Sequence, residues 1–195
     1  MRIRQGVDSL RRLSGRGVYP PAFAWLLLLP LRRLVISPSQ LADRLALSPS
    51  DRVLEIGPGP GYFSVEVARR VPAGHLDLLD VQAEMLELAR RRLERARMMN
   101  TTLAAGDAAA LPYPSAAFDV VFLVTVLGEI AQRERAVSEI ARVLRPGGRL
   151  SITESGGDPD RLSPTELASL LEPHAFRRSG SVGGRRARTV TFVRG

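Results

Sequence analysis

The chain has 195 residues, of which 45% are hydrophobic and 25% are charged, so it is long enough for one domain with a substantial core. The absence of cysteine excludes a disulfide framework and any thiolate metal site, and it fits a reducing cytoplasm. All 28 basic residues are arginine, and the net charge of +8 is concentrated in residues 1–35 and 173–195, which therefore suit a membrane surface, nucleic acid, an anionic substrate or simple solvation.

Residues 18–36, VYPPAFAWLLLLPLRRLVI, form an apolar stretch that two arginines interrupt. Its uninterrupted part is too short to span a membrane, and Arg32 and Arg33 stand where a secretory signal would have a small-residue cleavage site. Three interpretations stay open: a helix that covers the ligand site and lines the substrate pocket, an interfacial anchor, or plain core packing. The first makes Tyr19 and Trp25 candidate substrate residues, and the second puts Trp25 at the depth of the lipid headgroups.

Residues 37–47, SPSQLADRLAL, are predicted to form a helix. Ser37 is a suitable N-cap with Pro38 at the first helical position, and leucines recur on one face of the helix. A turn at residues 48–51 leads from this helix into the first strand.

Residues 53–64, VLEIGPGPGYFS, combine a strand, a glycine turn and the start of a helix. The apolar run is typical of a parallel strand that is buried on both faces, and a helical period follows over residues 62–71. Gly57, Gly59 and Gly61 lie between the two, where the lack of a Cβ lets the backbone approach a ligand. The pattern predicts the first βα unit of a doubly wound α/β sheet.

The glycine turn differs from that of a dinucleotide-binding enzyme. The third glycine of G-x-G-x-x-G would fall on Tyr62, and Pro58 and Pro60 remove backbone donors that a pyrophosphate would use. Glu55 places a carboxylate beside the turn, which would repel phosphates and attract a cationic ligand. We therefore expect a nucleoside ligand that lacks phosphates and carries a positive charge.

These residues resemble the first motif of the class I S-adenosylmethionine-dependent methyltransferases, [DE]-x-G-x-G-x-G. The resemblance implies S-adenosylmethionine as the cofactor and methyl transfer by in-line displacement, in which the protein positions the reacting atoms and no metal is required. It implies the following cofactor-binding residues in this motif: Glu55, Gly57, Pro58, Gly59 and Gly61.

Two further strands are predicted at residues 75–80 and 101–105, with a helix over residues 81–98 between them. Asp80 ends the first of these strands about 20 residues beyond the glycines, where a ribose-binding acid is expected. In the resembled family this acid holds both ribose hydroxyls, and Val81 is a cofactor contact beside it. Capping of the following helix is an alternative role for Asp80 that is compatible with the first.

A Gly-Asp-Ala step follows the third strand. In the resembled family the acid of this step, here Asp107, accepts a hydrogen bond from the adenine amino group, and the next backbone N–H, here that of Ala108, meets the ring. A plain turn aspartate is the alternative. The loop at residues 111–119 has a pattern typical of small-molecule methyltransferases and supplies Tyr113 as a candidate substrate residue.

The fourth strand is predicted at residues 120–124, buried on both faces, with Val124 at its end as a cofactor contact. Residues 125–130 then open the loop over the methyl group. Glu129 in this loop is the candidate catalytic residue, at a place where many small-molecule relatives have a histidine. Its carboxylate is suited to orient a substrate hydroxyl or amine, to act as a base, or merely to cap the next helix.

The remaining elements complete the sheet. A helix over residues 133–144 is stopped by RPGG and followed by a strand, which is a further mark of the family. The predicted ranges are 150–154 for that fifth strand, 165–172 for a short helix, and 174–182 and 188–193 for an antiparallel strand pair.

The resemblance covers about residues 38–194 and implies a Rossmann-like, doubly wound sheet. Seven strands are expected in the order 3-2-1-4-5-7-6, with strand 7 antiparallel. The chain divides into an N-terminal arm with helices, residues 1–48, which covers the site or touches a membrane, and a cofactor-binding methyltransferase domain, residues 49–195.

The favoured function is methyl transfer to a small-molecule or lipid-like acceptor, in a branch similar to the quinone-biosynthesis C-methyltransferases. The stretch at residues 18–36 would suit a hydrophobic acceptor and peripheral contact of a cytoplasmic protein with the inner membrane surface. An RNA methyltransferase is the alternative, because EIGPGPGYFS also resembles ribosomal RNA adenine dimethylases. Residues 125–128 lack the [ND]-[LP]-P-[YF] step of those enzymes, so nucleic acid is the less favoured partner. A non-catalytic cofactor-binding or membrane-associated module is the lesser alternative.

Overall fold

A single seven-stranded sheet organises the described part of the chain, in the order β3-β2-β1-β4-β5-β7-β6. The structure is a computed structural model that describes residues 36–195, so Tyr19, Trp25 and all but the last residue of the stretch 18–36 lie outside the described residues. The observed strand order is the predicted order 3-2-1-4-5-7-6, so that prediction is confirmed.

Strands β1 to β5 are parallel to one another, and the C-terminal pair β6 and β7 forms one edge of the sheet. The strands are β1 (Arg52–Ile56), β2 (His75–Asp80), β3 (Thr101–Ala105), β4 (Phe118–Val124), β5 (Leu144–Ser155), β6 (Phe176–Gly183) and β7 (Ala187–Arg194). Strand β7 runs antiparallel to both β5 and β6, as predicted.

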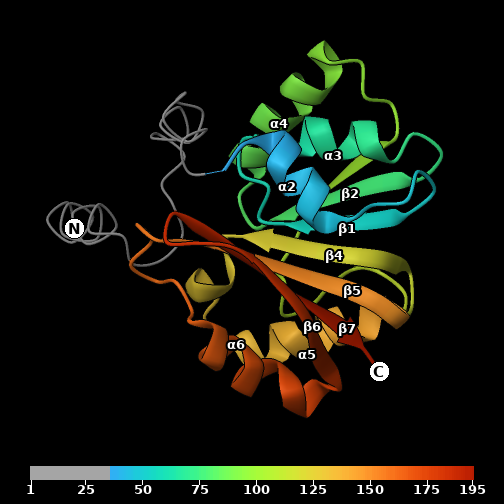
Figure 1. Cartoon of the computed structure of the whole chain (residues 1–195). Helices are drawn as coiled ribbons and strands as arrows, with labels where there is room; N and C mark the ends of the chain where they lie inside the picture. The colour runs from blue at the N-terminus through green and yellow to red at the C-terminus, as the bar shows by residue number, and fades with distance from the viewer. Residues whose placement is uncertain (1–35) are drawn as a thin grey trace, which may run out of the picture.

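Helices cover both faces of the sheet (Figure 1). On one face lie α2 (Pro38–Leu45), α3 (Ser64–Arg70) and α4 (Ala83–Arg95), and on the other lie α5 (Arg133–Val143) and α6 (Pro164–Leu171). Two short 3-10 helices, η3 (Leu127–Glu129) and η4 (Glu172–His174), follow β4 and α6. The sheet is thus the middle layer of three.

Each face of the sheet has its own apolar core because side chains alternate along a strand. In β1, Val53 belongs to the core under α2, α3 and α4, whereas its neighbour Leu54 belongs to the core under α5 and α6. In β4, Phe122 and Leu123 divide in the same way. A strand that is buried on both faces reads as a continuous apolar run, which is why these strands could be predicted.

The helix caps follow from the sequence. The hydroxyl oxygen of Ser37 accepts a hydrogen bond from the N–H of Gln40 at 3.2 Å, and Pro38 occupies the first turn, as predicted. Ser163 caps α6 in the same way, by accepting from the N–H of Glu166 at 3.2 Å.

Strand β5 begins earlier than predicted, at Leu144 rather than at residue 150. Leu144 pairs with Phe118 and Arg149 with Val120, so the RPGG segment between them is accommodated as an irregularity of the β4–β5 register. Gly147 in that segment has a φ of +75°, which glycine adopts at little cost. RPGG therefore follows the end of α5 but lies within the strand.

Within residues 36–195, every helix falls short of the length and apolar character that a membrane crossing requires.

Candidate active site

The carboxyl ends of β1, β2 and β4 meet at one edge of the sheet. Parallel register places Ile56 of β1 beside Leu79 of β2 on one side and Leu123 of β4 on the other. The direction of strand order reverses between β1 and β4, and ligands of doubly wound sheets bind at the carboxyl edge where this reversal occurs. This edge is the candidate active site.

The glycine turn after β1 is shaped by three left-handed residues. Gly57, Gly59 and Gly61 have φ values of +68°, +53° and +73°. A Cβ on Gly57 would lie 2.5 Å from Cγ2 of Val126, in the loop after β4, and a Cβ on Gly61 would lie 3.0 Å from Cα of Ala89 in α4. Both the backbone conformation and the close packing therefore call for glycine, and they leave a turn lined by backbone atoms.

Asp80 at the end of β2 is hydrogen-bonded to this turn. Its Oδ2 accepts a hydrogen bond from the N–H of Gly59 at 3.1 Å, and its Oδ1 accepts from the N–H of Gln82 at 3.0 Å. Burial raises the pKa of the Asp80 carboxyl, and the hydrogen bonds from Gln82, Gly59 and Val81 oppose that rise. The N-cap residue of α4 is Gln82, so the alternative role of Asp80 as the cap itself is wrong.

An apolar side chain and a second acid stand beside Asp80. Val81 is 56% exposed, whereas Asp80 is only 8% exposed. Asp107 lies beyond β3, whose Ala105 is paired with Asp80, and its Oδ1 accepts from the N–H of Ala109 at 2.9 Å. Ala108 is buried beside it. The structure thus brings the predicted residues of β2 and β3 to the same edge as the glycines.

Glu55 is the predicted acid that lies deepest. It is buried in β1, and its Oε2 accepts a hydrogen bond from Oγ of Ser64 at 2.6 Å. Ser64 is the first residue of α3, so this contact joins the strand to the helix across the glycine turn. Sequence reasoning did not identify Ser64. Val124 ends β4 and is also buried, beside the loop that carries Val126.

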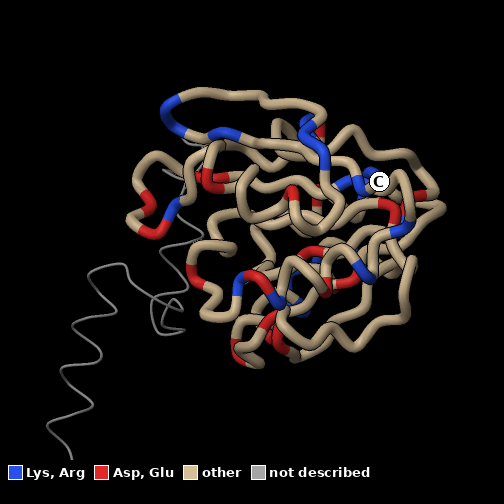
Figure 2. The backbone as a smooth tube through the Cα atoms, turned by 90° about the horizontal axis from the view of Figure 1, so that it is seen from below, with Lys and Arg blue, Asp and Glu red and all other residues tan. Residues whose placement is uncertain are grey.

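Glu129 lies in η3, under the loop that joins β5 to α6. A Cβ on Gly128 would collide with the carbonyl oxygen of Asp160, so η3 and this loop (residues 156–163) are in contact. Burial, followed by the charges of Asp158, Asp160 and Asp80, raises the pKa of Glu129 to about 7. Figure 2 marks the acidic and basic residues along the described backbone.

Glu154, near the end of β5, is a candidate that sequence reasoning missed. Its side chain is 7% exposed, and among the described residues neither carboxyl oxygen has a partner in hydrogen-bonding geometry. Burial and the charge of Asp158 raise its pKa to about 8, which Leu162 and Arg161 partly oppose and Glu129 reinforces. The available signal was an acid that ends an apolar strand, as at Asp80.

Tyr113 is not brought to this edge. Its ring packs edge-on against Phe118, with the centroids 5.0 Å apart, and Phe118 begins β4 whereas the candidate site lies at the other end of that strand. Burial, and then the charge of Asp77, raises the pKa of Tyr113 to about 12. The prediction of Tyr113 as a substrate residue thus has no support from its position.

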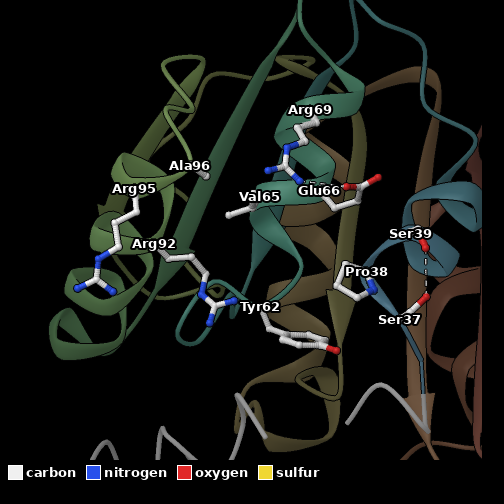
Figure 3. Close-up of a pocket in the computed structure, with 10 residues that line it drawn as sticks. All are labelled: Ser37, Pro38, Ser39, Tyr62, Val65, Glu66, Arg69, Arg92, Arg95 and Ala96. Carbon is white, nitrogen blue, oxygen red and sulfur yellow. Dashed lines mark hydrogen bonds and ion pairs between the residues drawn. The ribbon is translucent and has the colours of Figure 1, made fainter. Parts of the chain in front are cut away.

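A surface hollow of about 710 Å³ lies in the helical layer between α3, α4 and the start of α2 (Figure 3). Tyr62 and Val65 line it, and Arg69, Arg92 and Arg95 surround it. Glu55, Asp80 and Asp107 do not line it, and Tyr62, which follows the glycine turn, is its nearest residue in sequence to the carboxyl edge. Among residues 36–195, no group of three or more His, Cys, Asp or Glu side chains is arranged to hold a metal ion.

Comparison with known proteins matches residues 53–148 to the family described as "Methyltransferase domain". The chain is 36% identical over 115 residues to the "Ubiquinone/menaquinone biosynthesis C-methyltransferase UbiE" of Ruegeria sp. (strain TM1040). It is 38% identical over 113 residues to the "Demethylmenaquinone methyltransferase" of Deinococcus radiodurans. Each alignment covers 58% of this chain and 46% of the relative, so the chain spans about half the length of these curated relatives.

A solved structure has the same fold. The chain superposes on a SAM-dependent methyltransferase from Aquifex aeolicus with a TM-score of 0.81, covering 90% of this chain and 99% of the other. The sequences are 22% identical, so this likeness concerns the fold.

Proposed function

We propose that the chain is a class I S-adenosylmethionine-dependent methyltransferase and that it methylates a small hydrophobic acceptor of the hydroquinone type. The observation that carries the proposal is the buried Asp80 carboxylate, which is hydrogen-bonded to the glycine turn at the point where the strand order reverses. The N–H of Gly59 already donates to this carboxylate rather than to a pyrophosphate, and the hydroxyls of a ribose would donate to it as well.

The residues at the carboxyl edge fit this cofactor. Gly57 and Gly61 leave no room for a side chain, so a ligand would meet backbone at the turn. Asp80 would hold the ribose hydroxyls, the exposed side chain of Val81 would cover one face of the adenine, and Asp107 would accept from its amino group. The bound cofactor would supply a methyl group on a positively charged sulfur, and the acids of this edge would favour that charge.

A hydroquinone acceptor is supported by the names of the reported relatives, which refer to quinone biosynthesis. The RNA alternative is not carried further, because residues 125–128, TVLG, lack the step that stacks a base. For residues 1–48 we propose the role inferred from the sequence, that of an N-terminal arm beside the methyltransferase domain. The apolar stretch within it would cover the acceptor or give peripheral contact with the inner membrane surface.

The test is a binding and labelling experiment on the full chain. We expect isothermal titration calorimetry to detect S-adenosylhomocysteine binding and to give no heat with NADH. With tritiated S-adenosylmethionine and a fractionated cell extract, label is expected in the lipid and small-molecule fractions. Failure to bind S-adenosylhomocysteine would refute the assignment of the site, and label in RNA alone would refute the acceptor class.

A further inference from the structure

Glu154 is a buried acid whose carboxyl oxygens have no partner in hydrogen-bonding geometry among residues 36–195, although the backbone N–H of Leu162 lies close enough to lower its pKa. Burying a carboxyl group without partners costs free energy, and buried polar groups in proteins are nearly always hydrogen-bonded. Glu154 is only 7% exposed, and the Leu162 N–H acts on its carboxyl group from outside ordinary hydrogen-bonding geometry. We therefore expect a bound ligand to supply a hydrogen-bond donor for the Glu154 carboxyl group.

The position of Glu154 places it beside the loop that follows β4. In the β4–β5 register Val124 pairs with Thr153, and the N–H of Thr125 donates to the carbonyl of Thr153 at 2.8 Å. Glu154 is the next residue of β5, so it stands next to the start of the loop that leads to Glu129. Both acids therefore belong to the edge that holds Asp80.

The charged groups around Glu154 come from three elements. Glu129 faces it from η3, and Asp158 and Arg161 face it from the β5–α6 loop. Arg188 of β7 is its partner in strand register, but the Arg188 side chain is exposed to solvent. The two nearby acids oppose the ionisation of Glu154, and Arg161 only partly offsets them.

We propose that Glu154 is the base that accepts the hydroxyl proton of the methyl acceptor, which is therefore an aromatic compound with a free hydroxyl, such as a hydroquinone. This inference rests on the proposed function and adds a residue and a chemical requirement to it. Glu129 is then a positioning residue, whose charge adds to the basicity that burial and Asp158 give Glu154.

The proposed step balances as follows. The hydroxyl proton passes to the Glu154 carboxylate while the oxygen electrons flow into the ring, and a ring carbon forms a bond to the methyl group. The bond between that methyl and sulfur breaks, and its electron pair stays on sulfur to give S-adenosylhomocysteine. The ring carbon then loses its own proton to water, and the oxygen recovers its proton from Glu154. One proton is released for each methyl transferred.

The basicity of Glu154 suits this role. An ordinary carboxylate is too weak a base to draw a proton from a phenolic hydroxyl, and general bases act best when their pKa is close to the working pH. Burial and Asp158 raise the pKa of Glu154 to about 8, which brings it into that range.

The first experiment tests the requirement for a hydroxyl donor. Under anaerobic conditions, 1,4-dihydroxynaphthalene and 1,4-dimethoxynaphthalene are titrated into the full chain saturated with S-adenosylhomocysteine. We expect the diol to bind about 10-fold or more tightly than the ether, and Glu154→Met to abolish that difference. Equal affinity of the wild-type chain for the two compounds would overturn the inference.

The second experiment tests proton transfer. Glu154→Gln keeps the shape and a hydrogen-bonding group, so we expect unchanged S-adenosylhomocysteine affinity but a fall in kcat of about 100-fold or more with the diol. The rise of wild-type kcat with pH near 8 should disappear in this variant and shift to lower pH in Glu129→Gln. The exposed Glu172→Gln is the matched control, with wild-type kinetics expected.

The outcomes separate the two proposals. If the wild-type chain fails to bind S-adenosylhomocysteine, the proposed function itself is refuted. If binding is intact and Glu154→Gln keeps the wild-type kcat and pH profile, the role of Glu154 is refuted and the proposed function stands.

Discussion

The Oδ2 atom of Asp80 and the backbone N–H of Gly59 are joined by a hydrogen bond of 3.1 Å, which fastens the end of β2 to the middle of the glycine turn. The same carboxylate also accepts from the N–H of Gln82, just before α4. A single side chain thus holds the turn, the strand end and the helix start in register. The predictions that follow begin with this contact.

Substitution of Asp80 is expected to weaken cofactor binding more than folding. Asp80→Asn keeps one acceptor oxygen but removes the charge, so we expect the affinity for S-adenosylhomocysteine to fall about 10-fold. Asp80→Ala also leaves the Gly59 N–H without its partner and should cost about 100-fold. Isothermal titration calorimetry measures both values. Affinity equal to wild type in the alanine variant would remove Asp80 from the binding site.

Alanine at Gly57 is expected to be costly for two separable reasons. The left-handed backbone costs an alanine about 1 kcal/mol, and the clash with Val126 adds about 1–3 kcal/mol to the loss of unfolding free energy. Gly147→Ala is the matched control, because Gly147 has a similar φ of +75° and nothing within 4 Å of its Cβ position. Urea denaturation should show the smaller loss for Gly147→Ala.

A second substitution identifies the clash as the cause. Val126→Ala removes both Cγ atoms that a Cβ on Gly57 would meet. We expect the double variant Gly57→Ala/Val126→Ala to be more stable than the sum of the two single losses predicts, with a coupling of about 1 kcal/mol or more. Strict additivity in urea denaturation would show that the contact is not the source of the cost.

The free energy of unfolding is expected to fall as pH rises. In the folded protein the pKa of Glu129 is raised to about 7 and that of Glu154 to about 8, from the ordinary value of 4.5. Between these values the folded state binds more protons than the unfolded state, so each group lowers stability by up to about 1.4 kcal/mol per pH unit. The stability that each protonated carboxyl group contributes is fully present below pH 4.5, and it is lost as the pH rises through the raised pKa.

Urea denaturation from about pH 5 to about pH 8.5 measures this dependence. Glu129→Gln and Glu154→Gln should each flatten the curve, because the amide cannot ionise. Glu172→Gln, at an exposed position, should leave the slope as in wild type. A curve that keeps its full slope in both Glu129→Gln and Glu154→Gln would contradict the assignment.

The cap of α6 is expected to stabilise the end of the β5–α6 loop. Ser163 accepts from the N–H of Glu166, and Glu166 in return accepts from the N–H of Ser163 at 2.7 Å. Ser163→Ala should therefore lower the free energy of unfolding by about 1 kcal/mol. In Glu166→Gln the side chain can still accept that hydrogen bond, so a smaller loss is expected from thermal or urea denaturation.

Removal of residues 1–35 tests the proposed arm. Ile36 is kept because it is buried in the core under α2 and α3. We expect the affinity for S-adenosylhomocysteine to stay within about twofold of wild type, while KM for a hydrophobic acceptor rises about tenfold from lost apolar contact. Pelleting with anionic vesicles at low salt should also decrease. Unchanged KM and unchanged pelleting would refute both proposed roles of this arm.

Much of the fold could be predicted because its signals are local. A strand buried on both faces is a continuous apolar run, and a change to helical period marks the following helix. The bounds of β2 and β3 were predicted to the residue, whereas β5 was predicted to begin too late. Its first pairing, between Leu144 and Phe118, depends on another strand and leaves no trace in the RPGG segment itself.

The sequence by itself determined which residues end the strands: Glu55, Asp80 and the glycines between them stand at fixed distances from apolar runs. Only the tertiary structure decided what those ends meet. The isolation of Glu154, the contact of Gly57 with Val126 and the separation of Tyr113 from the carboxyl edge each join segments far apart in the chain. The burial and charge of a site arise from such packing, and no local pattern of residues encodes them.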